Sequence, residues 1–167
     1  MFEIKVTNLH WMENLDESED KCLHGHAWVR IGEETLEFDQ ATVSATAFSL
    51  LKSLIRSDPN EYRSMIQYLP CCGFDMSVWK GEVILFGCPN GVDWSVIHED
   101  GMIRLVTESH HEVKIPFDEY QKTVCAFADE IEAVYRNSKE KVFDSEEDRE
   151  VYAAFWNEWH QIRNQYP

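Results

Sequence analysis

Three side chains that could ligate a metal ion occur within five positions of the chain, as Cys22, His24 and His26. In a β-strand, residues two apart share one face at a spacing of about 6.6 Å, so the two imidazoles can converge on one ion. A cysteine thiolate beside them would supply the soft ligand that zinc accepts. The pattern allows a zinc-dependent enzyme or sensor. The alternative is a partly buried strand entrance, in which the cysteine packs and the histidines form hydrogen bonds.

A vicinal cysteine pair, Cys71-Cys72, lies between Pro70 and Gly73. Adjacent cysteines close only a strained disulfide ring, and no basic neighbour lowers the pKa of either thiol. We therefore expect this pair to pack at a strand entrance. The chain has five cysteines in all, an odd number without the dense spacing of a secreted disulfide scaffold. The sequence thus predicts reduced thiols and a cytoplasmic location.

Several catalytic signatures are absent from the sequence. It has no Gly-x-Gly-x-x-Gly loop, no Walker-type phosphate loop, no Gly-x-Ser-x-Gly elbow and no His-Glu-x-x-His helix. We expect no cofactor other than the zinc considered above. The sequence leans against an enzyme without excluding one.

The charge of the chain points to a class of partner. Its 15 lysines and arginines stand against 31 aspartates and glutamates, a formal net charge of −16. Such a field repels nucleic acids and anionic membranes and attracts basic proteins. Two charged stretches, residues 13–21 and 139–150, are predicted to be surface. The candidate partner-binding residues in them are Asp16, Glu17, Glu19, Asp20, Glu146, Glu147 and Asp148.

Three functions are compatible with these features. The leading one is a non-catalytic acidic binding protein, such as an immunity-type inhibitor that covers the cationic active site of a nuclease toxin. The second is the metal-binding enzyme or sensor. The third is a structural component that self-associates through a helix edge at Trp156, and the oligomeric state stays open. Against the first stands the possibility that the acidic residues only confer solubility.

The elements that position these residues follow from hydrophobic periodicity. Phe2, Ile4 and Val6 alternate with polar residues and predict a strand. Residues 27–31 and 35–38 flank Gly32 and predict a hairpin. Residues 44–57 carry apolar side chains at helical spacing, with Ser44 as a possible cap and Asp58-Pro59 as the end, and residues 61–67 could add a helical turn. A charged loop over residues 13–21 separates the first two strands.

The second half of the chain predicts a β meander followed by two helices. Lys80-Gly81 and Asp100-Gly101 mark tight turns between strands, and residues 89–91 a further turn. We expect Asp118 to cap one helix and Ser145 to cap the last, in which Trp156 and Trp159 cannot be equally buried. Together these elements predict a single α+β domain over residues 1–167, with an antiparallel sheet of roughly six to eight strands and about three helices packed on it.

Three segments resemble one group of proteins. They are residues 22–26, residues 87–94 (Gly-Cys-Pro-Asn-Gly-Val-Asp-Trp) and residues 154–159 (Ala-Phe-Trp-Asn-Glu-Trp). Together they resemble small acidic bacterial proteins without an assigned activity. The resemblance spans most of the chain and implies a bacterial single-domain protein, and it transfers no catalytic residues.

Overall fold

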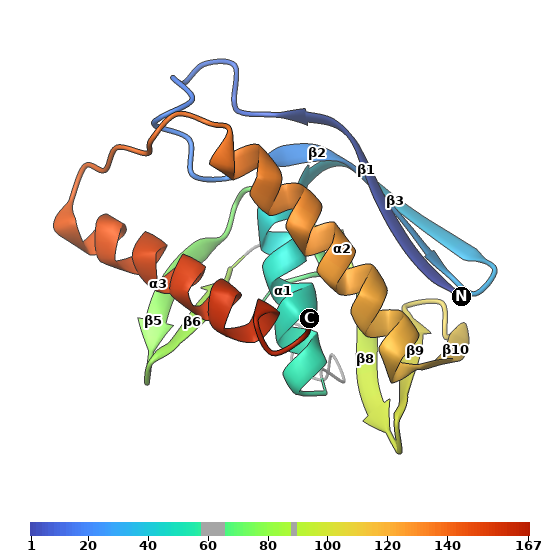
Figure 1. The fold of residues 1–167 in the computed structure, drawn as a ribbon. Coiled ribbons are helices and arrows are strands. Elements are labelled where there is room, and N and C mark those ends of the chain that lie inside the picture. Colours follow the sequence, from blue (N-terminus) through green and yellow to red (C-terminus); the bar gives the residue numbers. More distant parts are fainter. Residues whose placement is uncertain (58–65, 88–89) are drawn as a thin grey trace.

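The computed structural model describes residues 1–57, 66–87 and 90–167, and these ranges contain three helices and ten strands (Figure 1). The elements are β1 (Phe2–His10), β2 (His24–Ile31), β3 (Glu34–Thr42), α1 (Val43–Ile55), β4 (Leu69–Pro70), β5 (Asp75–Trp79), β6 (Glu82–Phe86), β7 (Gly91–Val92), β8 (Trp94–Glu99), β9 (Met102–Thr107), β10 (Glu112–Pro116), α2 (Phe117–Arg136) and α3 (Glu146–Arg163). The predicted α+β class is confirmed.

The strands form several small sheets rather than one large sheet. In the described ranges the antiparallel sheets have the orders β1-β2-β3, β10-β9-β8, β4-β7 and β5-β6. The prediction of one sheet with six to eight strands is therefore wrong. One reason is that β3 runs directly into α1, which carries the chain away from the sheet. Another is Asp93, whose carboxylate accepts the N–H groups of Tyr68 and Trp94 at 3.1 and 3.0 Å and so separates β7 from β8.

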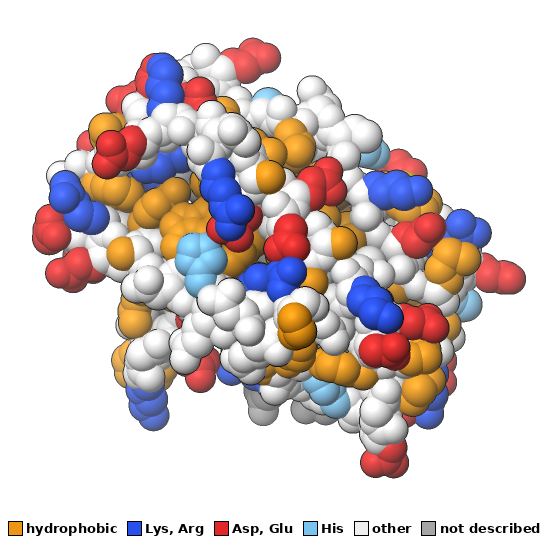
Figure 2. Space-filling view, in the orientation of Figure 1, with side chains coloured by type: hydrophobic (Ala, Val, Ile, Leu, Met, Phe, Trp, Pro, Cys, Tyr) orange, Lys and Arg blue, Asp and Glu red, His pale blue; other side chains and the backbone are white. Residues whose placement is uncertain are grey.

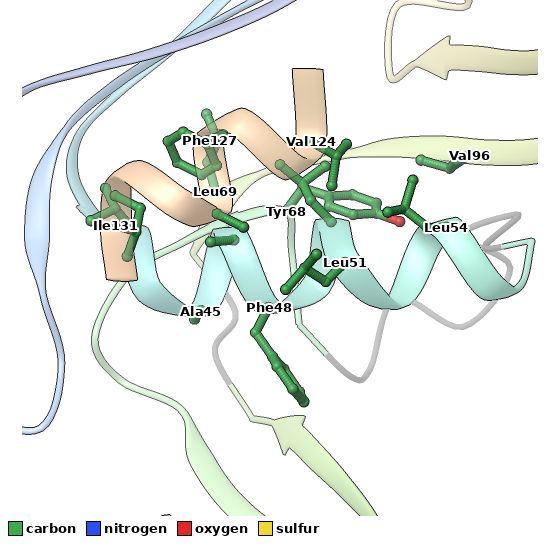
Figure 3. Close-up of a cluster of buried hydrophobic side chains, with 14 of the residues drawn as sticks. Ala45, Phe48, Leu51, Leu54, Tyr68, Leu69, Val96, Val124, Phe127 and Ile131 are labelled. Carbon is green, nitrogen blue, oxygen red and sulfur yellow. The ribbon is translucent and has the colours of Figure 1, made fainter. Parts of the chain in front are cut away.

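Helix α1 lies at the centre of the molecule. Figure 3 shows Leu51 and Leu54 of this helix in a cluster with Val124 and Phe127 of α2, whereas Phe48 points away from α2 and has its ring centroid 4.6 Å from that of Phe155. These apolar side chains are nearly inaccessible to solvent, as their helical spacing predicts. The N-cap residue is Thr42 rather than Ser44 and makes no side-chain cap bond. The predicted helix end at Asp58-Pro59 and most of the helical turn at residues 61–67 lie outside the described residues, as does Pro89 of the predicted turn.

Helices α2 and α3 begin in different ways. Ser145 caps α3, and its hydroxyl accepts the N–H of Asp148 at 3.1 Å, as predicted. The predicted cap at Asp118 is wrong, since α2 begins after Pro116, which leaves Asp118 in the first helical turn. There its carboxylate favours the positive end of the helix dipole without a capping bond.

Two hairpins have the predicted two-residue turns. Lys80 and Gly81 have φ of 50° and 83°, and Asp100 and Gly101 have 45° and 80°. Positive φ at both central positions is the geometry that matches the twist of antiparallel strands. Both turn predictions are thus confirmed, and the first of them sets the pairing of β5 with β6.

Candidate functional site

The two acidic stretches of the sequence lie against each other in the fold. The loop between β1 and β2 runs beside the connection between α2 and α3 (Figure 1), and the N–H of Val142 donates to the carbonyl of Ser18 at 2.9 Å. We call residues 11–21 and 137–150 together the acidic end. The first stretch holds five acids against one base, and the second holds six acids against three bases.

Lys141 fastens the two stretches of the acidic end together. Its side chain is buried, and Nζ donates to the carbonyl of Glu17 at 2.6 Å. The same ammonium lies 3.5 Å from the centroid of the Trp11 ring. Burial lowers the pKa of Lys141, because the charged form loses hydration. The carbonyl and the ring face offset that loss, so one buried cation holds the loop in place.

Tyr135 of α2 anchors the far side of the same loop. Its hydroxyl donates to the carbonyl of Lys21 at 2.7 Å and accepts the N–H of Leu23 at 3.1 Å. Its ring meets the edge of Trp11 at a centroid distance of 5.0 Å. Burial raises the pKa of Tyr135 well above its ordinary value, so the hydroxyl keeps its proton and remains a donor. The loop is therefore held at both ends by α2 and the connection that follows it.

Asp20 is turned into the protein. It is only 5% exposed, and its carboxylate accepts the N–H groups of Met12 and Cys22 at 2.8 and 3.0 Å. The prediction that Asp20 belongs to an exposed binding surface is therefore wrong. A closed loop leaves backbone donors inside it that need an acceptor, and Asp20 supplies that acceptor.

The other acids predicted in the loop take part in its internal bonding. Asp16 pairs with Lys139 at 2.7 Å and accepts the N–H of Ser18 at 3.0 Å, which together lower its pKa. Glu19 accepts the N–H of Asp16 at 3.0 Å, and Glu17 accepts the N–H of Lys139 at 3.2 Å. These bonds give the exposed loop one conformation, which reduces the ordering entropy of any binding event.

The acids predicted at the start of α3 are exposed. Glu146 lies 3.6 Å from Arg149, and Asp148 accepts the hydroxyl proton of Ser145 at 2.6 Å. All three acids of this turn, Glu147 included, lie at the positive end of the helix dipole. These three acids thus stabilise the N-terminal end of α3, and their carboxylates remain exposed to solvent.

Sequence reasoning missed two features of the acidic end. In the described part of the chain, no basic side chain lies within ion-pair distance of Glu13, Glu140, Asp144 or Glu147. Among these acids stand exposed apolar side chains, Met12 at 38%, Leu15 at 41% and Val142 at 53%. Figure 2 shows charged and hydrophobic side chains interspersed over this end. A signal was present in the sequence, since these apolar residues follow neither strand nor helix period.

The three predicted metal ligands do not converge. His24 is buried with its Nδ1 3.6 Å from the Asp20 carboxylate, whereas the His26 side chain is 32% exposed and its Nδ1 is 2.6 Å from Asp39. The described residues contain no group of three histidine, cysteine or acidic side chains that could hold a metal ion. The pairing of β2 shifts against β1 between Thr7 and His10 and against β3 between Gly25 and Ala27, and at both places the extra residue lies in the partner strand. His24 and His26 therefore differ in their surroundings, because Asp20 of the preceding loop lies beside His24, whereas His26 lies beside the exposed Asp39.

The His24 ring is enclosed without a good hydrogen bond. Within the described residues, neither of its ring nitrogens has a hydrogen-bond partner, and Nδ1 lies 3.6 Å from the Asp20 carboxylate. Burial lowers the pKa of His24. The ring is therefore held neutral beneath the loop that Asp20 closes.

The cysteines divide into free and bonded residues. Cys22, Cys72 and Cys125 are free thiols, whereas Cys71 is disulfide-bonded, so the prediction that all thiols are reduced is wrong for Cys71. Burial raises the pKa of Cys22 to about 12. Cys22 lines a cavity of about 30 Å³ with Ser44 and other neighbours, which is room for about one or two water molecules. A thiol that keeps its proton beside so small a space is suited to packing.

Trp156 joins the two long helices. It is half-buried, and its ring centroid lies 4.9 Å from that of Tyr135 on α2 and 5.0 Å from that of Trp159. Trp159 is fully buried, so the predicted difference between the two tryptophans is confirmed. Figure 2 shows hydrophobic side chains gathered between α2 and α3, in keeping with these contacts.

Comparison of the chain with protein-family models, with curated proteins and with solved structures finds no match. Among the helices of the described residues, none combines the length and the apolar character needed to cross a membrane.

Proposed function

We propose that this protein is a non-catalytic acidic binding protein whose acidic end takes a basic protein partner, in the manner of an immunity-type inhibitor. The observation that carries the proposal is the contact between residues 11–21 and 137–150, made by Lys141 and by the Val142–Ser18 hydrogen bond. This contact joins two acidic stretches that are more than a hundred residues apart in the sequence.

The composition of the acidic end suits a protein partner better than a small ion. Met12, Leu15 and Val142 offer apolar area for burial. Carboxylates without an ion pair in the described part of the chain are close to them in sequence, Glu13 to the first two and Glu140 and Asp144 to Val142. A basic partner would bury the apolar side chains while its lysines and arginines meet the rim. Electrostatic attraction would also speed the encounter and weaken as salt is added.

The experiment compares two sets of neutralised carboxylates. One variant carries Glu13→Gln, Glu140→Gln, Asp144→Asn and Glu147→Gln at the acidic end. The matched control neutralises the same number and types of acid elsewhere, with substitutions at Glu33, Asp100, Glu119 and Glu130, which are exposed. Wild type and both variants are immobilised, and basic proteins of the native host are passed over them at low salt.

We expect wild type and the control variant to retain the same basic protein. The acidic-end variant should bind that protein with an affinity at least about tenfold lower. Elution with salt should come earlier for the acidic-end variant than for the control. Equal weakening in both variants would mean that net charge alone attracts the protein, and would overturn the proposal. Retention of no basic protein by wild type would overturn it as well.

A further inference from the structure

The β5–β6 hairpin extends from the body of the protein, at the lower left of Figure 1. Its tip carries the most exposed large hydrophobic side chain of the described residues, Trp79 at 63%, next to Val78 at 44%, and Phe86 lies at its base at 37%. In the described part of the chain, β5 pairs with β6 alone. The hairpin thus has two outer edges, and their surroundings differ.

The backbone groups that face outward follow from the turn. With Lys80-Gly81 as a two-residue turn, Trp79 and Glu82 form the hydrogen-bonded closing pair, and hydrogen-bonded and non-hydrogen-bonded pairs alternate from there. Val78 and Val83 are therefore a non-hydrogen-bonded pair, whose N–H and C=O groups point to the two outer edges. The next pair of this kind is Met76 and Leu85.

The outer edge of β6 is closed by side chains. The N–H of Val83 donates to Oε2 of Glu158 at 2.6 Å, and its carbonyl accepts from Nζ of Lys52 at 2.7 Å. Lys52 and Glu158 also pair with each other at 2.9 Å. One donor and one acceptor thus stand where a neighbouring strand would be. This confirms the direction of the Val83 groups, and it prevents strand addition on that side.

The outer edge of β5 is open. Within the described residues, no hydrogen bond reaches the outward N–H or C=O groups of Met76 and Val78. β5 contains no proline and no lysine, which are residues that proteins place on edges to prevent strand addition. Among the other edge strands of the described residues, β1 and β10 carry Lys5 and Lys114, whereas β3 and β8 carry neither lysine nor proline. An open, partly apolar edge of this kind accepts another strand.

We propose that the occupant of this edge is β5 of a second copy of the chain, paired antiparallel about a two-fold axis at Ser77. In that register Met76 of each copy faces Val78 of the other. Both are outward-pointing residues, so each pair can exchange two hydrogen bonds. Asp75 faces Trp79 of the second copy. Lys80 lies over its own Trp79 ring at 6.0 Å and so comes next to Asp75 of the second copy. The edge is therefore complementary to itself in both hydrogen bonding and charge.

The charge of the chain distinguishes this dimer from the acidic-end complex. Two copies that each carry a charge of −16 repel each other, so added salt should strengthen their pairing. Binding of a basic partner should weaken with salt. Met76 of the hairpin lines the same small cavity as Lys21 of the acidic end, but the dimer uses the backbone edge of β5 and does not depend on the proposed function.

The test is sedimentation equilibrium of the full chain up to about 200 μM, at about 50 mM and about 500 mM NaCl. Wild type should form a dimer, and more of it at the higher salt. Val78→Pro removes an outward N–H that makes no hydrogen bond within the monomer. In the proposed dimer this N–H donates to the other copy, so its loss from both copies removes half of the hydrogen bonds between them. It should weaken association about tenfold or more, while circular dichroism shows a folded chain.

Charge reversal gives a second, independent readout. Lys80→Asp should weaken the dimer, and Asp75→Lys combined with Lys80→Asp should restore it. Lys122→Asp changes the net charge equally at an exposed site on α2, and should leave association close to that of wild type. A wild type that stays monomeric at both salt concentrations overturns the proposal. The proposal is also overturned if Val78→Pro associates as tightly as wild type, or if Asp75→Lys combined with Lys80→Asp fails to restore the dimer.

Discussion

Replacing Lys141 with alanine removes the cation that fastens the acidic end. Its hydrogen bond to the Glu17 carbonyl, at 2.6 Å, is of a charged kind that contributes about 1.5–3 kcal/mol. Its contact with Trp11, at 3.5 Å, is of a kind that contributes about 0.5–2 kcal/mol. Burial of the ammonium opposes both and lowers its pKa. We therefore expect Lys141→Ala to lower the free energy of unfolding by about 2 kcal/mol.

The assay is urea unfolding at neutral pH combined with amide hydrogen exchange. Lys139→Ala is the matched control, because the Lys139–Asp16 pair is about half exposed on both sides and solvent-exposed pairs contribute little to stability. In Lys141→Ala the amide of Val142, which donates to Ser18, should exchange faster. In Lys139→Ala it should keep most of its protection.

One outcome refutes this reasoning about Lys141. If Lys141→Ala and Lys139→Ala unfold within about 0.5 kcal/mol of each other and the Val142 amide stays protected in both, the buried ammonium does not hold the loop. The acidic end would then owe its conformation to other contacts, such as the Tyr135 hydroxyl bonds.

Three further predictions concern buried groups. Burial lowers the pKa of the His24 imidazole in the folded chain. Near pH 6 this imidazole therefore takes up a proton only when the chain unfolds. In urea titrations, the free energy of unfolding should decrease as the pH is lowered from about 6.5, by up to about 1.4 kcal/mol per pH unit. His24→Leu should lack this decrease. The same dependence of the unfolding free energy on pH in wild type and His24→Leu would contradict the prediction. Burial raises the pKa of Cys22 to about 12, whereas Cys72 is exposed. Mass spectrometry after iodoacetamide treatment should therefore find Cys72 labelled first, and similar rates would count against the buried thiol. Trp159→Ala should cost about 3–5 kcal/mol and exposed Trp79→Ala less than about 1 kcal/mol, which thermal unfolding can compare.

Local elements could be predicted well because their signals are local. The alternation of Phe2, Ile4 and Val6, the Asp100-Gly101 turn and the Ser145 cap each depend on a few neighbouring residues. The division of the strands into small sheets could not be predicted. It depends on contacts such as the Asp93 carboxylate with Tyr68, which are 25 residues apart in sequence.

The candidate site was only partly predictable for the same reason. Charge density along the sequence identified the two acidic stretches. It could not show that Lys141 joins them, because Glu17 lies 124 positions away. It could not show that Asp20 turns inward, because this depends on where the loop closes. The different surroundings of His24 and His26 depend on where the loop places Asp20, which residue spacing along β2 does not indicate.

The central claim, that the acidic end binds a basic protein, is tested most directly by hydrogen exchange of this protein with and without the basic protein that it retains. The account predicts slower exchange in residues 11–21 and 137–150 on binding, with the amides near Met12, Leu15 and Val142 most affected. Protection confined to other parts of the chain, with these two stretches unchanged, would contradict it.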